Sequence, residues 1–300
     1  MVDNVNEPVG ARAAAFLDLD KTIIASSSAL AFSRHFYDGG LINRRAVLRG
    51  AYAQLVFRTG GADHDQIERL RAALCAQVAG WPVHQVSEIV AETLHTVVDP
   101  VVYAEAADLI DVHHAGGLDV VIVSTSGAEI VEPIGEMLGA DRVVATRMRV
   151  DDGRYTGEIA DYVYGPAKAE AVRRLAADLG YDLAECYAYS DSATDLPMLE
   201  AVGHPHAVNP DRALRREAAA RGWPVLDFDH PVPLRRRIAA RRGSHVAAAF
   251  GAGVVGLAWY ASRRRVRVDP SAPLPFRPRV EYEGRQRLSR RLRSARRTAR

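Results

Sequence analysis

The chain has 300 residues, 48% of them hydrophobic, which is enough to bury a substantial core and excludes a wholly disordered protein. Its net charge of +2 is unevenly distributed: residues 1–230 carry 20 basic and 34 acidic side chains, whereas residues 231–300 carry 19 and 3. The two cysteines, Cys75 and Cys186, lie far apart, which argues against a disulfide framework or a zinc knuckle. The first 15 residues contain no apolar stretch long enough for a signal peptide, so we expect a cytoplasmic body.

The first predicted strand, Ala13 to Leu17, runs into Asp18-Leu19-Asp20-Lys21-Thr22. Residues two apart in a strand share a face, so both carboxylates are expected to converge at one strand end. Such a pair suits a divalent metal and a nucleophile beside an acid/base; the alternative is a turn pair after an edge strand. Lys21 and Lys168 are the chain's two lysines beside 37 arginines. This bias favours, for each of them, a site that needs a compact ammonium, with chance survival as the alternative.

A helical insert is predicted over residues 25–100. Apolar residues recur at spacings of three and four in Leu41 to Phe57, Gln66 to Val78 and Val83 to Leu94. A further helix, Val101 to His114, ends at a glycine signal. We therefore predict a core formed by residues 1–24 and 101–230, with an all-helical insert between its first two strands.

From Asp119 onward, strands alternate with helices. The predicted strands are Val120–Val123, Val143–Ala145, Cys186–Tyr189, His206–Val208 and Pro224–Leu226, with a hairpin formed by Arg147–Val150 and Tyr155–Ile159. The predicted helices are Glu129–Leu138, Pro166–Leu179, one beginning near Thr194, and Asp211–Arg221. This order is typical of an α/β protein with a doubly wound, mostly parallel sheet, whose ligands bind beyond the carboxyl ends of the strands.

Polar residues follow the apolar strands at those ends, and their types suit phosphoryl transfer. A carboxylate that attacks a phosphate dianion is repelled by like charge, so the site must supply cations. Asp18 and Asp191 are candidate ligands for Mg²⁺, while Ser124 and Lys168 are candidates for holding the phosphoryl oxygens. Asp18 is then the expected nucleophile and Asp20 the expected general acid/base.

These segments resemble the four ordered motifs of the haloacid dehalogenase superfamily, in the branch of phosphoserine phosphatase-like enzymes with a helical cap. The resemblance covers about residues 13–228 and rests on Asp18–Thr22, Ser124, Lys168 and Ser190–Leu199. It implies a Rossmann-like core, Asp18 as nucleophile, and Asp20 as acid/base with its backbone carbonyl on Mg²⁺. It also implies phosphate binding by Ser124, Thr125 and Lys168, metal binding by Asp191, and support of the site by Asp195.

Two departures bear on the substrate. Phosphoserine phosphatases carry a glutamate nine residues after the nucleophile, and this chain has Ser27 there; Ser190, Ser192 and Thr194 also replace the usual glycines and asparagine of the fourth motif. The prediction is therefore a magnesium-dependent phosphomonoester hydrolase acting on a small phosphorylated metabolite, without phosphoserine specificity being established. The alternatives are a phosphotransferase or phosphomutase of the same superfamily, or a membrane-associated lipid-phosphate phosphatase.

The tail, residues 231–300, is rich in arginine and contains an uncharged segment, residues 246–261. A spanning helix needs about 20 apolar residues, so a segment of 16 is marginal as a membrane anchor; the alternatives are a membrane-surface or partner helix, or an added soluble helix. A basic stretch beside an apolar segment fits anionic lipid better than nucleic acid, so no specific nucleic-acid partner is expected.

Two groups of histidines stand outside these motifs. They are His113-His114 and His204-Pro205-His206. Neither has a third ligand at metal-binding spacing, so we interpret them as surface or loop histidines.

Overall fold

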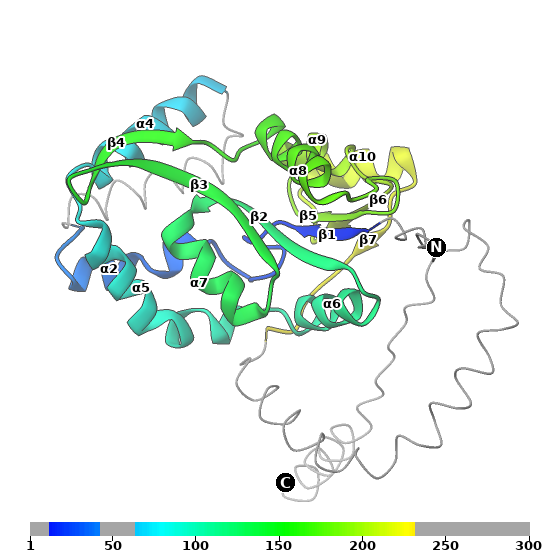
Figure 1. The fold of residues 1–300 in the computed structure, drawn as a ribbon, viewed down its shortest axis with the longest axis horizontal. Coiled ribbons are helices and arrows are strands. Elements are labelled where there is room, and N and C mark those ends of the chain that lie inside the picture. The colour runs from blue at the N-terminus through cyan, green and yellow to red at the C-terminus, as the bar shows by residue number, and fades with distance from the viewer. Residues whose placement is uncertain (1–11, 43–63, 232–300) are drawn as a thin grey trace, which may run out of the picture. The chain divides into compact units, whose positions relative to one another are not determined.

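A computed structural model describes residues 12–42 and 64–231, with side-chain environments given for 12–42 and 71–231. Its centre is a sheet of seven strands in the order β4-β3-β2-β1-β5-β6-β7 (Figure 1). The strands are β1 (Ala14–Leu17), β2 (Asp119–Gly127), β3 (Arg142–Asp151), β4 (Arg154–Asp161), β5 (Tyr187–Ser190), β6 (His204–Val208) and β7 (Val225–Leu226). All neighbouring strands run parallel except β3 and β4, which confirms the predicted mostly parallel α/β sheet.

The central strand β1 is buried on both faces, as its uninterrupted apolar sequence requires. Leu17 of β1 pairs with Ile122 of β2 on one side and with Tyr189 of β5 on the other. Asp18 therefore leaves the sheet between the ends of two parallel neighbours. The first and fourth motifs are brought together by this register, although more than 160 residues separate them in sequence.

Helices cover both faces of the sheet (Figure 1). On one face, α6 (Ala104–Ala115) and α7 (Ala128–Leu138) pack with the side chains of Ala15, Leu17 and Ile122. On the other, α8 (Pro166–Leu179), α9 (Leu196–Leu199) and α10 (Arg212–Arg221) pack with Phe16 and Val123. The alternation of side chains along each strand thus supplies one apolar layer to each set of helices.

The described part of the insert is helical. It contains α1 (Ser28–Ala31), α2 (Ser33–Asp38), α4 (His64–Val78) and α5 (Val83–Val97), followed by the 3₁₀ turn η1 (Asp99–Val101). Helix α5 packs against α7, and α4 packs on β4. Gly157 makes the second contact possible, because a Cβ on this residue would lie 2.9 Å from Ala79 Cβ, and its φ of +87° favours glycine. The division of the chain into core, insert and tail remains a prediction.

Several boundaries differ from those predicted. The predicted strand at Val143 and the first arm of the hairpin form one continuous strand, β3, which reaches a two-residue turn at Asp152 and Gly153. Positive φ angles at both turn residues (45° and 69°) match the turn that joins twisted antiparallel strands. The predicted helix near Thr194 begins as a 3₁₀ turn, η2 (Ala193–Asp195), before α9.

Two predicted segments lie partly or wholly outside the described residues: most of the helix Leu41–Phe57, and the apolar segment 246–261. Within the described ranges, no helix combines the length and apolar character needed to cross a membrane.

The interpretation of His113 as a surface residue was wrong. Its side chain is buried beneath the sheet, where Nε2 lies 2.9 Å from the Tyr189 hydroxyl. His206 of β6 is half-buried and stacks on the ring of Tyr189 at 4.8 Å between centroids. These histidines therefore contribute to an aromatic layer between α6 and strands β5 and β6.

Candidate active site

Asp18 is the first residue after β1 and is fixed by a backbone contact with β5. Its N–H donates to the Tyr189 carbonyl at 2.9 Å, and the residue is 6% exposed. This contact directs the chain past the end of the sheet, so the Asp18 side chain lies among residues that follow β5 and begin α8. Asp18 and the fourth motif therefore lie together, as expected for polar residues that follow neighbouring parallel strands.

Lys168 joins two of the predicted carboxylates. It lies in the first turn of α8, which follows Gly165 and begins with Pro166. Its Nζ lies 2.6 Å from Asp18 Oδ1 and 2.7 Å from Asp195 Oδ2. Because Lys168 is only 2% exposed, both contacts are buried, charge-assisted hydrogen bonds.

Asp195 is held from a second direction. The Ser190 hydroxyl donates to Asp195 Oδ2 at 2.7 Å, and Ser190 is fully buried. The sequence predicted a supporting role for Asp195 but gave none to Ser190. A serine at this place in a strand could as well have been a packing residue, so the sequence carried no separate signal for the contact.

The carboxylates of Asp18, Asp195 and Asp191 all interact with the buried ammonium of Lys168. Burial raises the pKa of Asp18 to about 7 against the opposing effect of Lys168, and the charges of Asp195 and Asp20 raise it further. Burial likewise raises the pKa of Asp191 to about 6, although Lys21 opposes the increase. Burial alone would lower the pKa of Lys168, but Asp18 and Asp195 outweigh it and raise that pKa above its usual value. The cluster thus has more negative than positive charge.

The oxygen donors of this cluster fit a hard divalent cation. Asp191 is 9% exposed, and among the described residues its carboxylate accepts no hydrogen bond. Asp18 Oδ1 is held by Lys168, which leaves Oδ2 as its second donor. Mg²⁺ is usually held by one or two carboxylates and completes its coordination with water and phosphate oxygens. Asp18 and Asp191 suit this pattern, and the raised pKa values indicate that a further cation would be stabilising.

Asp20 lies two residues after Asp18, near enough for its charge to raise the pKa of Asp18, and it contacts two serines. Its Oδ1 accepts from the Ser28 N–H at 2.9 Å, and its Oδ2 accepts from the Ser126 hydroxyl at 3.3 Å. The Ser28 and Ser126 hydroxyl oxygens are 2.8 Å apart. These contacts, which we call the Asp20 wall, orient a half-buried carboxylate. Neither serine was predicted. Ser126 reaches Asp20 and Ser28 from about 100 residues away, whereas Ser28 lies eight residues after Asp20.

The predicted phosphate-binding residues of the second motif lie at the same edge of the sheet. Ser124 is 1% exposed and its hydroxyl accepts from the Ser126 N–H at 3.2 Å. Since Leu17 pairs with Ile122, Ser124 of β2 and Asp18, which directly follows β1, both lie just beyond that paired level. Thr125 is half-buried beside them. The structure thus brings these residues to one edge of the sheet, while their contacts with a phosphate remain a prediction.

The loop that carries Asp191 is tied to α10. The Asp211 N–H donates to the Asp191 carbonyl at 2.7 Å, and Asp211 Oδ2 accepts from the Ala193 N–H at 3.1 Å. Asp211 Oδ1 also caps α10 by accepting from the Leu214 N–H at 2.7 Å. An aspartate just before a helix is a recognisable cap signal, but its contact with the loop could not be read from the sequence.

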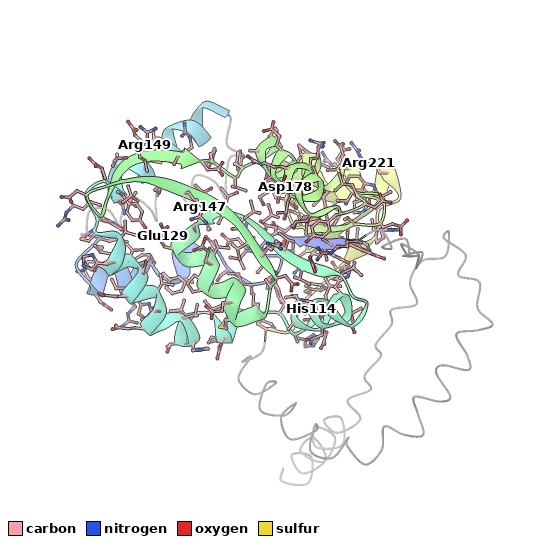
Figure 2. All side chains as sticks on the ribbon, viewed as in Figure 1. His114, Glu129, Arg147, Arg149, Asp178 and Arg221 are labelled. Carbon is pink, nitrogen blue, oxygen red and sulfur yellow. The ribbon has the colours of Figure 1, made fainter. Side chains whose placement is uncertain are left out.

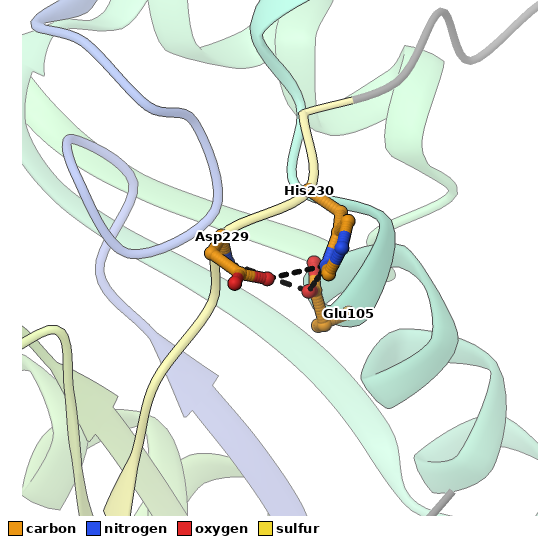
Figure 3. Close-up of side chains that lie close together, drawn as sticks. All are labelled: Glu105, Asp229 and His230. Atoms are coloured by element: carbon orange, nitrogen blue, oxygen red, sulfur yellow. Dashed lines mark hydrogen bonds and ion pairs between the residues drawn. The ribbon is translucent and has the colours of Figure 1, made fainter. Parts of the chain in front are cut away.

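A second group of ligand-type side chains lies apart from this cluster, at Glu105, Asp229 and His230 (Figure 3). His230 Nδ1 is 2.8 Å from Glu105 Oε1 and also contacts Asp229. Asp229 and His230 are mostly exposed, with side-chain exposures of 76% and 72%. This group joins the end of the described chain to the start of α6 and was not predicted.

The chain is similar in sequence to several known proteins. A protein of Streptomyces azureus named "Inhibition of morphological differentiation protein" is 68% identical over 265 residues, covering 86% of this chain and 96% of its own. A probable phosphatase of Mycobacterium tuberculosis is 59% identical, with 87% of this chain and 92% of that protein covered. A phosphoserine phosphatase of the same species is 34% identical, with coverages of 87% and 83%.

Solved structures share the fold. A protein of unknown function from Bordetella pertussis matches with a TM-score of 0.64 at 28% identity, covering 72% of this chain and 99% of its own. A substrate-bound phosphoserine phosphatase matches with a TM-score of 0.55 at 20% identity, covering 76% of this chain and 98% of its own. The family model for haloacid dehalogenase-like hydrolases matches residues 15–200, a range that runs from β1 through α9. The chain therefore belongs to the haloacid dehalogenase-like hydrolase family.

Proposed function

We propose that the protein is a magnesium-dependent phosphomonoester hydrolase that works through an aspartyl-phosphate on Asp18. The observation that carries the proposal is the buried contact of Lys168 with both Asp18 and Asp195, beside the carboxylate of Asp191, whose pKa burial raises although Lys21 and Lys168 oppose the increase. A site of this kind favours a dianionic ligand only when a further cation is bound. The names of the relatives, a probable phosphatase and a phosphoserine phosphatase, support the same reaction class.

Asp18 and Asp20 divide the chemistry in this proposal. An Asp18 carboxylate oxygen attacks phosphorus, and the bond between phosphorus and the alkoxy oxygen breaks. Asp20 gives its proton to the departing alkoxide, then takes one from the water that attacks the aspartyl-phosphate. Phosphate leaves and the Asp18 carboxylate is restored. Ser28 and Ser126 keep the Asp20 carboxylate directed at the reacting oxygen through the contacts of the Asp20 wall.

Charge stabilisation comes from the other side of the cluster. Ser124, Thr125 and Lys168 are placed to hold the phosphoryl oxygens, as positioning and charge compensation are the main requirements of phosphoryl transfer. Asp18 and Asp191, with the Asp20 backbone carbonyl, would hold Mg²⁺, which when bound supplies further compensation for the phosphate charge. Asp195 and Ser190 keep Lys168 in position.

The proposed substrate is a small phosphorylated metabolite. Ser27 stands where phosphoserine phosphatases have a glutamate, so phosphoserine itself is not implied by the resemblance. Transfer of the phosphoryl group to a second substrate is the alternative, because an aspartyl-phosphate can react with an alcohol as well as with water. The two reactions are separated by comparing inorganic phosphate released with substrate consumed in the presence of an alcohol acceptor.

The test is magnesium-dependent release of inorganic phosphate from an aryl phosphate. We expect Asp18→Asn to reduce release to the level of the buffer, and Asp20→Asn to slow it by about 10²- to 10⁴-fold when the leaving group is a poor one. Asp229→Asn is the matched control, since it makes the same change at an exposed carboxylate and is expected to leave the rate unchanged. Full activity in Asp18→Asn would rule the proposal out.

Membrane association is a separate proposal that rests on the sequence of residues 246–261 and its flanking arginines. It would make lipid phosphates accessible as substrates. The full chain and a chain ending at Asp229 are to be compared by flotation with vesicles of anionic and of neutral lipid. We expect the full chain to float with anionic vesicles but not with neutral ones, and the shortened chain to float with neither. Equal behaviour of the two chains would reject membrane association through the tail.

A further inference from the structure

Asn209 is a polar residue at the same edge of the sheet as the candidate site, and the proposed mechanism gives it no role. It directly follows β6 and is half-buried. Strand β6 is the parallel neighbour of β5, which leads into Asp191 (Figure 1). Since Ser190 of β5 pairs with Ala207 of β6, Asp191 and Asn209 both lie just beyond the last level at which these strands pair.

The Asn209 side chain clamps the backbone that follows β7. Its Oδ1 accepts from the Phe228 N–H at 2.8 Å, and its Nδ2 donates to the Phe228 carbonyl at 3.0 Å. The N–H of Asn209 donates to the Leu226 carbonyl at 2.9 Å. The amide therefore pairs with Phe228 as the backbone of a further strand residue would, and three hydrogen bonds fix Asn209.

The backbone conformation explains why this residue is an asparagine. Its φ is +43°, in the left-handed region that glycine, asparagine and aspartate adopt most readily. Glycine would have no side chain to hold Phe228, and the carboxylate of an aspartate could accept a hydrogen bond but not donate one. Asparagine supplies the donor, the acceptor and the conformation together.

The turn that begins at Asn209 holds the loop that carries Asp191. Asn209 is followed by Pro210, which is buried and whose ring fixes its φ, and then by Asp211. The Asp211 N–H donates to the Asp191 carbonyl at 2.7 Å. Three consecutive residues with little freedom thus connect the clamp on Phe228 to the backbone of Asp191. Mg²⁺ demands near-ideal octahedral geometry, so a carboxylate that binds it must be held accurately.

We propose that Asn209 is a positioning residue that fixes Asp191 for the binding of Mg²⁺ by anchoring the turn Asn209–Asp211 to Phe228. It contacts neither the metal ion nor the substrate. Loss of the clamp therefore weakens Mg²⁺ binding more than it changes the reaction of the enzyme once Mg²⁺ is bound. The inference rests on the proposed function and adds to it a residue that sets the affinity for the metal ion.

The experiment measures Mg²⁺ binding to the full chain by isothermal titration calorimetry without substrate. Asn209→Gly permits the same backbone conformation but removes the amide. We expect it to raise the dissociation constant for Mg²⁺ by about tenfold, as is typical when a group that orients a metal ligand is lost. At saturating Mg²⁺, kcat and KM for the aryl phosphate should stay within about threefold of the native values.

Tyr181→Phe is the matched control, because it also removes a side-chain hydrogen bond between two segments. The Tyr181 hydroxyl donates to Asp119, at the start of β2 and therefore at the other edge of the sheet. Urea denaturation should show a loss of stability in both variants. The dissociation constant for Mg²⁺ should be unchanged in Tyr181→Phe, and an equal increase in both variants would overturn the inference.

Pro210→Ala is a milder second variant that keeps every hydrogen bond of Asn209. It makes the turn less rigid at a small cost in stability, and should raise the dissociation constant for Mg²⁺ by about twofold to fivefold. If Asn209→Gly folds and binds Mg²⁺ as the native chain does, Asn209 has a structural role alone and the inference is overturned. If Asn209→Gly does not fold, unchanged Mg²⁺ binding in Pro210→Ala overturns it.

The native chain separates failure of this inference from failure of the proposed function. A native chain that binds Mg²⁺ and hydrolyses the aryl phosphate, with both variants binding Mg²⁺ equally well, overturns the role of Asn209 alone. A native chain that neither binds Mg²⁺ nor releases phosphate overturns both proposals.

Discussion

Two clusters of acidic side chains with a basic partner differ in what surrounds them. Lys168 joins Asp18 and Asp195 at side-chain exposures of 2%, 9% and 3%. His230 joins Glu105 and Asp229 at the surface, where the side chains of His230 and Asp229 are 72% and 76% exposed and that of Glu105 is 25% exposed. The contacts have similar lengths, so distance alone does not distinguish the clusters.

Burial is the property that separates them. In the Lys168 cluster, removal from water raises the pKa of Asp18 and makes any unpaired charge costly, so geometry and charge balance are both fixed by the fold. In the His230 cluster, the glutamate and aspartate raise the pKa of His230, but solvent screens the interaction. Closely spaced metal-type ligands are therefore weaker support for function than a buried charge imbalance.

The largest effect is expected from removing the buried ammonium. Lys168→Met leaves Asp18 and Asp195 buried without their cation, so the free energy of unfolding should fall by about 3–5 kcal/mol at neutral pH. Phosphate release should fall by at least about 10²-fold. Urea denaturation and the aryl phosphate assay measure the two effects.

Arg149→Met is the matched control, because Arg149 pairs with Glu158 at 3.2 Å with both side chains mostly exposed (Figure 2). It should leave both measurements almost unchanged. Acidification should partly restore the stability of Lys168→Met, since protonation removes the carboxylate charges. If Lys168→Met and Arg149→Met lost similar amounts of stability and activity, burial of an ion pair would not be what makes it important.

A smaller effect is expected from His113, a buried base whose Nε2 lies 2.9 Å from the Tyr189 hydroxyl of β5. Burial, then the charges of His206 and His114, lowers its pKa from 6.5 to about 4. The unfolded chain therefore binds a proton at a higher pH than the folded chain does. Stability contributed by neutral His113 is full above about pH 6.5 and is lost as the pH falls towards 4, by about 3 kcal/mol.

His113→Gln cannot titrate and keeps a hydrogen-bonding group near the Tyr189 hydroxyl. Its stability should fall less steeply between pH 6.5 and pH 4, and the difference between the two curves isolates His113 from the carboxylates. Parallel curves would show that the pKa of His113 does not differ between the folded and unfolded chains.

The third effect concerns Asp211, an exposed residue that holds the buried site from outside. Asp211→Ala removes the acceptor for the Leu214 and Ala193 N–H groups, so urea denaturation should show a loss of about 1 kcal/mol. Asp211→Asn keeps an acceptor and should recover most of this loss. If Asp211→Ala lowered the free energy of unfolding more than Lys168→Met does, the exposed carboxylate would matter more than the buried cluster, which contradicts the proposed order.

The sequence was sufficient for the elements that have strong local signals. Strand β1 is a short apolar run before Asp18, and α8 lies between Pro166 and Gly180, so both were predicted within a residue of their observed bounds. Strand β3 was divided in two because Arg147 ends the less polar stretch Val143–Thr146, and beyond it Met148 and Val150 alternate with arginines. Pairing with β4 keeps the arm beyond Arg147 extended, and such pairing is a long-range effect.

The candidate site shows the same limit. Its charged residues belong to recognisable motifs, so Asp18, Lys168, Asp191 and Asp195 were predicted together. The serines that hold the carboxylates are ordinary in sequence and gain their roles from contacts in the fold. The Ser28 N–H and the Ser126 hydroxyl donate to Asp20, and the Ser190 hydroxyl donates to Asp195. His113 was misassigned for the same reason, because burial depends on what packs against a helix.

The smallest effect is expected at the exposed cluster, and it tests the comparison most directly. His230→Ala removes the shared partner of Glu105 and Asp229, yet solvent already screens both pairs. We expect no measurable shift of the urea midpoint and no change in the magnesium concentration that gives half-maximal phosphate release. Glu105→Gln should behave in the same way, although its Oε2 is buried without a hydrogen-bond partner among the described residues. A shifted magnesium requirement in either variant would mean that this surface cluster acts on the catalytic metal, and that burial alone does not identify the functional carboxylates.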